Sequence, residues 1–180
     1  MKNASSDLFS VTAYKAIIQN ALDNHYVFMT VKEFLDNNNL NIKLIVLDET
    51  ARTANDAAKS LNKKVGAIVK SLLFKNIENN EYYLCLVSGD QYMSIEKLSD
   101  ITNGKIVKAN ADECKEYTGF SIGGVSPFAH KTKPTNIFID KNLDKYESVY
   151  AAAGHPFVVF GITFEDLTKI TNGKVVSIVE

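Results

Sequence analysis

Segment 67–74 constrains the fold more than any other part of the chain, because it is apolar on both sides and yet contains a lysine. As a strand, it alternates between two sets of side chains, Ile68, Lys70, Leu72 and Phe74 on one face and Ala67, Val69, Ser71 and Leu73 on the other. Both sets are mostly apolar, so we expect a central strand that is covered on each side. The Lys70 ammonium then either reaches water past the strand end or lines a cleft that receives an anionic ligand. The pattern leaves both alternatives open.

Strand and short-helix patterns surround this segment without a regular strand–helix–strand repeat. We expect strands at 42–46, 67–74, 82–87, 106–109, 137–139, 149–152, 157–161 and 175–179. We expect helices at 10–25, 31–37, 54–61, 94–100 and 164–170 and one that begins at 110, with N-caps at Thr53, Ser94, Asn110 and Thr163. This order predicts a mixed α+β fold in which helices pack around a curved sheet.

The composition is that of an ordinary globular chain, with 46% hydrophobic and 23% charged residues among 180. That length suits one domain with a short appendage. No apolar run approaches the roughly 20 residues of a membrane span, and the N-terminus has no secretory apolar core. We therefore expect a cytoplasmic protein. Cys85 and Cys114 lie in unlike contexts, which favours separate buried thiols over a disulfide or a zinc site.

Basic residues gather in one stretch although the net charge is only −1. Between positions 52 and 75, Asp56 is the only acid, and the basic residues are Arg52, Lys59, Lys63, Lys64, Lys70 and Lys75. A local field of that sign could hold a phosphate backbone. Charge alone would favour the alternative, a solvated lysine face.

Two loops could contribute to a site. The adjacent glycines Gly123 and Gly124 allow close backbone approach and could direct N–H groups at one oxygen. On its own this feature is more typical of a plain loop. His155, between Gly154 and Pro156, could act as a general base near neutral pH, but a lone histidine beside proline more often occupies a turn. Nucleotide-binding glycine motifs, metal-ligand motifs and a nucleophile elbow do not occur.

Together these segments resemble the YbaK/prolyl-tRNA-synthetase-associated domain family over residues 31–180. The segments that carry the resemblance are Arg52-Thr53-Ala54, Ile68-Val69-Lys70-Ser71-Leu72, Leu86-Val87-Ser88-Gly89, Thr118-Gly119, Gly123-Gly124-Val125-Ser126-Pro127-Phe128, Ile139-Asp140 and Ala153-Gly154. We therefore divide the chain into an N-terminal helical extension, 1–30, and an editing domain, 31–180.

The resemblance implies a curved, barrel-like mixed sheet and an aminoacyl-tRNA deacylase that hydrolyses mischarged tRNA in trans. It implies catalytic roles for Lys70, Gly123 and Gly124, with Lys70 in the editing pocket and the glycine-rich loop donating N–H groups to the ester carbonyl. The substrate-binding residues would be Arg52, Thr53, Ser71, Val125, Ser126, Pro127, Asp140, Gly154 and His155. Family members generally use neither a metal nor a protein nucleophile, so water or a substrate hydroxyl attacks and no cofactor is expected.

The implied partner is the acceptor end of an aminoacyl-tRNA, such as tRNA for proline, and an aminoacyl-tRNA synthetase is a further candidate. Segment 151–156 differs from that of the cysteine-specific members, so alanine, serine, threonine and similar acids remain open. A noncatalytic module that binds tRNA or a synthetase is the alternative from another class, and a small-molecule-binding protein is the third.

Overall fold

The computed structural model describes residues 25–180, with side chains from residue 30 onward. The helix predicted at 10–25 therefore lies outside the described residues except for its last position. The helices of the described residues are α2 (His25–Asn37), α3 (Ala54–Leu61), α4 (Ile95–Thr102), α5 (Ala111–Thr118) and α6 (Phe164–Thr171), with 3-10 turns η1 (Val65–Ala67) and η2 (Lys141–Lys145). Its strands are β1 (Leu44–Val46), β2 (Val69–Asn76), β3 (Tyr82–Ser88), β4 (Ile106–Lys108), β5 (Asn136–Asp140), β6 (Val149–His155), β7 (Val158–Ile162) and β8 (Lys174–Val176).

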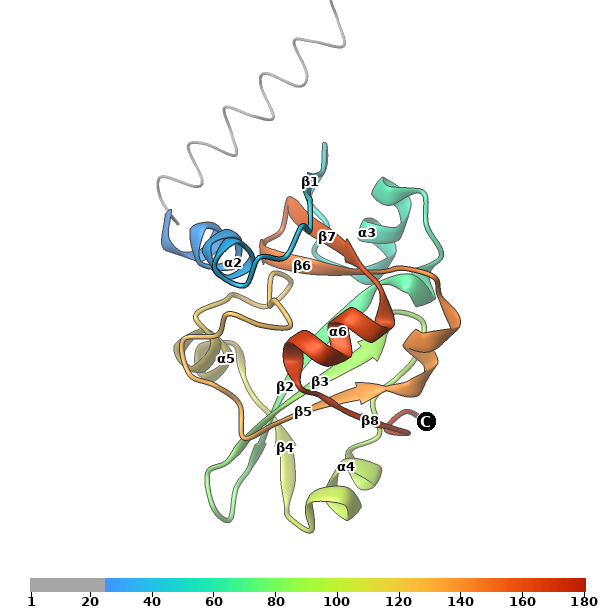
Figure 1. Ribbon diagram of the computed structural model, residues 1–180. Coiled ribbons are helices and arrows are strands. Elements are labelled where there is room, and N and C mark those ends of the chain that lie inside the picture. Colours follow the sequence, from blue (N-terminus) through green and yellow to red (C-terminus); the bar gives the residue numbers. More distant parts are fainter. Residues whose placement is uncertain (1–24) are drawn as a thin grey trace, which may run out of the picture.

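The strands of the described residues form two sheets and no closed barrel (Figure 1). The smaller sheet has the order β1-β7-β6 and is antiparallel. The larger has the order β4-β2-β3-β5-β8 and is mixed, because β5 runs parallel to both of its neighbours. The predicted mixed α+β class is confirmed, and the expected curved sheet is divided in two. Within residues 25–180, no helix combines the length and the hydropathy that a bilayer crossing requires.

The main core lies between the two sheets. Leu84, Leu86 and Ile139 of the larger sheet and Val149 and Phe160 of the smaller one are fully buried there. Helix α6 packs against the same core, and in Figure 1 it lies in front of the space between the sheets. The candidate site lies at the edge of this core, and several core residues line it.

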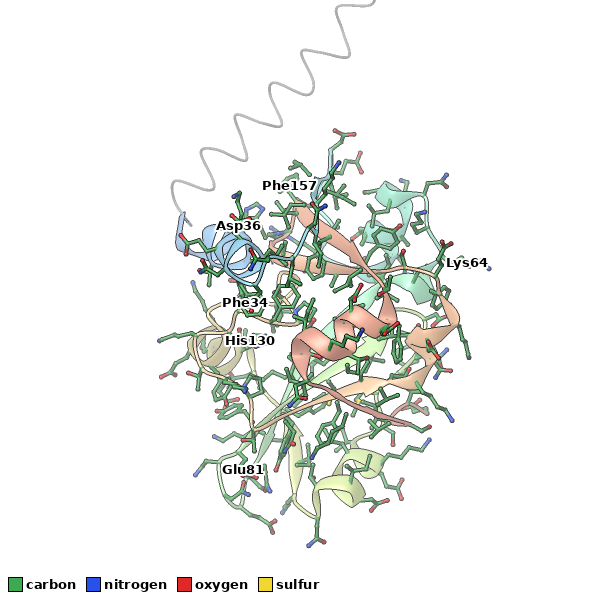
Figure 2. The ribbon with its side chains drawn as sticks, in the orientation of Figure 1. Phe34, Asp36, Lys64, Glu81, His130 and Phe157 are labelled. Atoms are coloured by element: carbon green, nitrogen blue, oxygen red, sulfur yellow. The ribbon has the colours of Figure 1, made fainter. Side chains whose placement is uncertain are left out.

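Helix α2 closes one end of the core and crosses the proposed domain boundary at residue 30. Its residues Val31 and Leu35 are 0% and 2% exposed. Phe34, labelled in Figure 2, stacks on Phe128, with ring centroids 4.8 Å apart. Helix α2 therefore belongs to both parts of the proposed division, and Val31 and Leu35 pack it into the core of the domain.

The predicted N-caps are present, because their chemistry is local. A side-chain oxygen accepts a hydrogen bond from the third helical amide at each of four positions, Thr53, Ser94, Asn110 and Thr163. Asn110 and Glu113 form a full capping box. The caps fix where α3 and α5 begin, and both helices border the candidate site.

Strand β2 separates two cores, as its two apolar faces predict. Val69 and Leu73 pack into the main core. Phe74 and the half-buried Leu72 pack on the other side, with Leu98 of α4. The strand is less central than expected, because β4 pairs with it only from Phe74 to Asn76.

Candidate functional site

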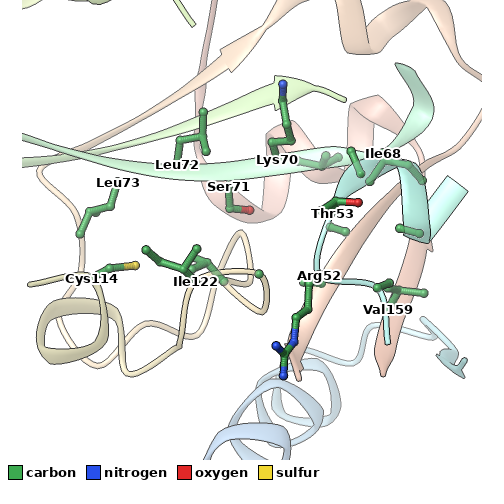
Figure 3. A pocket seen from close by; sticks show the side chains of 18 of the residues that line it. Arg52, Thr53, Ile68, Lys70, Ser71, Leu72, Leu73, Cys114, Ile122 and Val159 are labelled. Carbon is green, nitrogen blue, oxygen red and sulfur yellow. The ribbon is translucent and has the colours of Figure 1, made fainter. Parts of the chain in front are cut away.

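A cavity of about 290 Å³ opens beside β2, between the larger sheet, the smaller sheet and the glycine-rich loop (Figure 3). Most of its lining is apolar and much of it is small, including Ala51, Ala54, Ala57, Ile68, Val69, Leu73, Ala109, Val125, Ala151, Ala152 and Val159. Among the described residues that line it there is no aspartate or glutamate. Size and lining suit a small apolar group.

Successive side chains of β2 point to opposite sides of the strand, so only alternate ones face this cavity. Figure 3 shows Ser71 and Leu73 on one side of the strand, facing Cys114 and Ile122 across the cavity, and Lys70 and Leu72 on the other side. Ser71 and Lys70 both border the cavity, but they present their polar atoms in opposite directions.

Ser71 carries an unusual polar atom. Its Oγ is buried, and within the described residues it is the only buried side-chain nitrogen or oxygen without a hydrogen-bond partner. Leaving such a group unsatisfied costs about 1–3 kcal/mol. A water molecule or a ligand group can complete the hydrogen bonding of such a hydroxyl, so Ser71 is a candidate ligand contact.

Lys70 already has protein partners. Its Nζ donates a hydrogen bond to the backbone oxygen of Gln91 and lies 5.4 Å from the ring centroid of Tyr92. Burial lowers the pKa of the Lys70 ammonium and the nearby Lys108 lowers it further, while Asp90 opposes both. Lys70 thus borders the cavity, but its ammonium lies on the opposite side of β2, beside Gln91 and Tyr92 (Figure 3).

Arg52 and Thr53 line the cavity at the start of α3. The Thr53 hydroxyl is engaged as the N-cap, at 3.2 Å from the Asp56 nitrogen and 2.7 Å from Asp56 Oδ2. The exposed Arg52 side chain extends away from Lys70 in Figure 3. Arg52 is therefore available to a ligand at the mouth, whereas Thr53 serves mainly to position α3.

The glycine-rich loop, residues 123–128, contributes fewer residues to the cavity lining than its sequence suggests. Gly123, with φ of +89°, and Val125 line the cavity. The Gly124 amide donates to the Ser121 oxygen at 2.9 Å, and a Cβ added at Gly124 would lie 3.2 Å from the Gly154 oxygen. Gly124 is thus needed for contact with β6, and its N–H is already bonded.

Four further predicted residues do not line the cavity. Ser126 and Pro127 are buried within the loop itself, and Gly154 meets Gly124. Asp140 is fully buried at the end of β5 and accepts hydrogen bonds from Asn142 at 3.2 Å.

His155 is also outside the lining and ends β6 just before the turn to β7. Its Nδ1 accepts a hydrogen bond from the Phe157 amide at 3.3 Å, and the two rings stack. Burial lowers the pKa of the His155 imidazole. These contacts are those of the turn residue that the pattern favoured.

Sequence reasoning missed several lining residues, among them Lys108, Cys114, Ile122 and Tyr150. Lys63 lies 5.5 Å from the centroid of the Tyr150 ring, which brings another cation near the cavity. Burial raises the pKa of the Cys114 thiol, so it is not a thiolate at neutral pH. Ile122, between Ser121 and Gly123, was the one available signal, and the structure shows it exposed, as apolar side chains that meet a ligand often are. The described residues contain no cluster of three or more histidine, cysteine or acidic side chains that could hold a metal.

Comparison with known proteins assigns this site to a family. The model of the aminoacyl-tRNA editing domain matches residues 48–170, a range that contains every residue of the cavity lining. The chain belongs to the aminoacyl-tRNA editing domain family. The resemblance inferred from Lys70 and the glycine-rich loop is thereby confirmed at the level of the family.

Solved structures share the fold of this editing domain. One is described as a candidate trans-editing enzyme for prolyl-tRNA synthetase, with a TM-score of 0.80 and 33% identity over 86% of this chain and 98% of that one. Another is the hypothetical protein APE2540, with a TM-score of 0.77 and 25% identity over 84% and 99% of the two chains.

Curated relatives are of two kinds. The uncharacterised protein YwhH of Bacillus subtilis (strain 168) is 27% identical over 71% of this chain and 80% of its own length. A proline–tRNA ligase of Brachyspira hyodysenteriae is 32% identical over 51% of this chain, but the match covers only 16% of the ligase. The likeness to the ligase is thus limited to an editing-domain-sized part.

Proposed function

We propose that this editing-domain protein is a trans-acting aminoacyl-tRNA deacylase. Its substrate would be a tRNA, such as tRNA for proline, that carries a small non-cognate amino acid. Water, or a hydroxyl of the substrate, adds to the ester carbonyl carbon, and the bond to the ribose oxygen breaks. Hydrolysis then yields the free amino acid and a tRNA with its terminal hydroxyl restored. The cytoplasm, where tRNA is charged and used, is the compartment in which it would act.

The cavity carries this proposal. A volume of about 290 Å³, with six alanines and three valines in its lining, suits a small acyl side chain. Arg52, Lys70 and Lys108 border the same cavity, and cations at a cleft that lacks acids favour a polyanionic ligand. A site of this kind can accept both ends of an aminoacyl-tRNA, the acyl group inside and the phosphates outside.

We divide the roles of the residues accordingly. Ser71 and Val125 would contact the acyl group, and Gly123 would let the backbone approach the ester. Arg52 would hold the nucleotide end at the mouth, and Lys70, whose ammonium lies on the opposite side of β2 (Figure 3), would contact a phosphate there. Catalysis would come mainly from positioning the ester against the attacking oxygen.

The test is hydrolysis of a panel of mischarged tRNAs that carry alanine, serine, threonine or cysteine on tRNA for proline and on other acceptors. Wild type is compared with Ala152→Leu, which reduces the cavity, and with Ala111→Leu, a matched change at an exposed position outside the lining. We expect wild type and Ala111→Leu to release one small acid rapidly and Ala152→Leu to release it slowly. Binding of tRNA without release of any acid would instead support the noncatalytic tRNA-binding module.

A further inference from the structure

Tyr92 is the most exposed of the large hydrophobic residues in the described part of the chain, at 74%. Its main chain, by contrast, is held by the C-terminal segment. The Tyr92 oxygen accepts a hydrogen bond from the Glu180 amide at 3.0 Å, and the next residue, Met93, forms a bridge with Val179. An exposed ring on an ordered main chain loses little conformational freedom when a ligand stacks on it.

Two lysines lie on the side of the larger sheet that Tyr92 occupies. The Lys70 Nζ is 5.4 Å from the centroid of the Tyr92 ring. The exposed Lys108 of β4 is paired directly with Phe74 of β2, and direct partners in an antiparallel pair share a face of the sheet. Phe74 and Lys70 share that face too, since they are four positions apart in one strand. An aromatic ring beside cations is the arrangement with which proteins bind single-stranded nucleic acid, bases on the ring and phosphates at the cations.

The acids close to the ring do not neutralise these two lysines. Asp90 lies in the same loop, and its Oδ1 accepts hydrogen bonds from Ser88 Oγ at 2.9 Å and from the Gln91 side chain at 3.2 Å. Within the described residues, neither Lys70 nor Lys108 takes part in an ion pair. Both ammonium groups therefore remain available to phosphate.

This surface is continuous with the cavity. Lys70 and Lys108 line the cavity as well. Strand β4 pairs with β2 only from Phe74 to Asn76, and at the other end an isolated bridge joins Ile68 to Tyr150. Between these pairings no strand of the described residues runs along that edge of β2. A ligand chain can therefore leave the cavity across this edge and reach the side that carries the exposed ring.

We infer that Tyr92 is a stacking platform for a cytosine base of the acceptor end, with Lys70 and Lys108 at the phosphates that lead into the cavity. The inference rests on the proposed function for the identity of the ligand. Every tRNA ends in the unpaired sequence cytidine-cytidine-adenosine, and the adenosine carries the ester. With the ester in the cavity, the cytidines lie outside it. Stacking tolerates any base, so Tyr92 would strengthen the binding of every tRNA and leave selection of the amino acid to the cavity.

The kinetic arm of the test compares alanyl-adenosine with the alanyl ester of the trinucleotide cytidine-cytidine-adenosine. The ratio of kcat/KM on the second to kcat/KM on the first measures what the cytidines contribute. Loss of one contact between a base and a ring predicts that Tyr92→Ala lowers this ratio roughly 5- to 150-fold, mainly through KM. Tyr92→Phe keeps the ring and should keep the ratio. Ile77→Ala, which shortens another exposed apolar side chain at the end of β2, is the control. An unchanged ratio in Tyr92→Ala would overturn the inference.

The binding arm needs no catalysis, so it separates the inference from the proposed function. The unacylated trinucleotide, and a version with abasic sugars in place of both cytidines, are titrated into isotope-labelled wild type and Tyr92→Ala. In wild type, we expect the abasic version to bind at least about 5-fold more weakly and only the intact one to shift the amide signals of Tyr92 and Met93. In Tyr92→Ala the two should bind equally, because the lost base and the lost ring remove the same contact.

The outcomes of the binding arm are distinct. Cytosine-dependent binding without hydrolysis of any ester would sink the deacylase proposal alone. The inference would be overturned if wild type showed no cytosine-dependent binding, or if the abasic change weakened binding as much in Tyr92→Ala as in wild type.

Discussion

The two faces of β2 differ in how the protein surrounds their polar groups. On one face, Ser71 leaves a buried hydroxyl unsatisfied beside a cavity. On the other, Lys70 has a carbonyl acceptor and an aromatic ring as neighbours. The protein thus supplies partners for the Lys70 ammonium but none for the Ser71 hydroxyl. Ser71 is therefore the residue of this strand at which a ligand or a water can complete a hydrogen bond.

Truncation of the neighbouring leucines should show the largest difference between the two faces. Leu73 is 3% exposed in the main core, so Leu73→Ala should lower the free energy of unfolding by about 3 kcal/mol. Leu72 is only half-buried, and Leu72→Ala should cost about 1 kcal/mol. Urea unfolding measures both, and equal costs would mean that the faces do not differ in packing as described.

Removal of the Lys70 charge should change tRNA recognition more than stability. We expect Lys70→Ala to lower kcat/KM on aminoacyl-tRNA about 10-fold, and to reduce the slope of log affinity against log salt by about 0.7, the value for one contact with single-stranded phosphate. The fold should survive, because the half-buried ammonium has a lowered pKa and contributes little stability. Lys169→Ala on α6 is the control, and an unchanged salt slope in Lys70→Ala would remove Lys70 from phosphate binding.

The Ser71 face makes an opposite prediction for stability. Ser71→Ala removes a buried hydroxyl that has no partner, so it should raise the free energy of unfolding by about 1 kcal/mol while lowering activity. Thermal unfolding beside Ser99→Ala measures the first effect. A clear loss of stability in Ser71→Ala would show that the hydroxyl has a structural partner after all.

The smallest effect concerns pH and lies away from β2. Burial lowers the pKa of His130, although its Nε2 bonds to the Ser126 oxygen at 2.7 Å. The unfolded chain then takes up the proton first, so the histidine's contribution is complete above about pH 6.5 and declines as the pH falls. The free energy of unfolding should decrease between pH 7 and pH 5.5. His130→Gln should flatten that decrease, and an unchanged profile would contradict the account of the His130 pKa.

Sequence alone predicted the local chemistry well. The caps at Thr53 and Asn110 and the two-sided character of β2 follow from neighbours within a few residues, and the structure confirms them. The short pairing of β4 with β2 could not be predicted, since it depends on contacts between residues 30 to 34 positions apart.

The candidate site was predictable only in part, for the same physical reason. Residue types suggested that Gly124 and His155 could meet a ligand, but His155 bonds to Phe157 within its own turn, and Gly124 packs against Gly154, thirty positions away. Ser71 entered as one residue of a family segment, and only the folded chain shows that its hydroxyl lacks a partner. The catalytic and substrate-binding roles remain predictions.

The most direct test of the separate roles proposed for Ser71 and Lys70 compares a full aminoacyl-tRNA with a minimal ester, alanyl-adenosine, which has no phosphate. kcat/KM is measured on both for wild type, Lys70→Ala and Ser71→Ala. The account predicts that Ser71→Ala is impaired on both substrates, whereas Lys70→Ala is impaired on the tRNA and matches wild type on the minimal ester. An equal defect of Lys70→Ala on both would place the lysine at the ester itself and contradict the separation of the two faces.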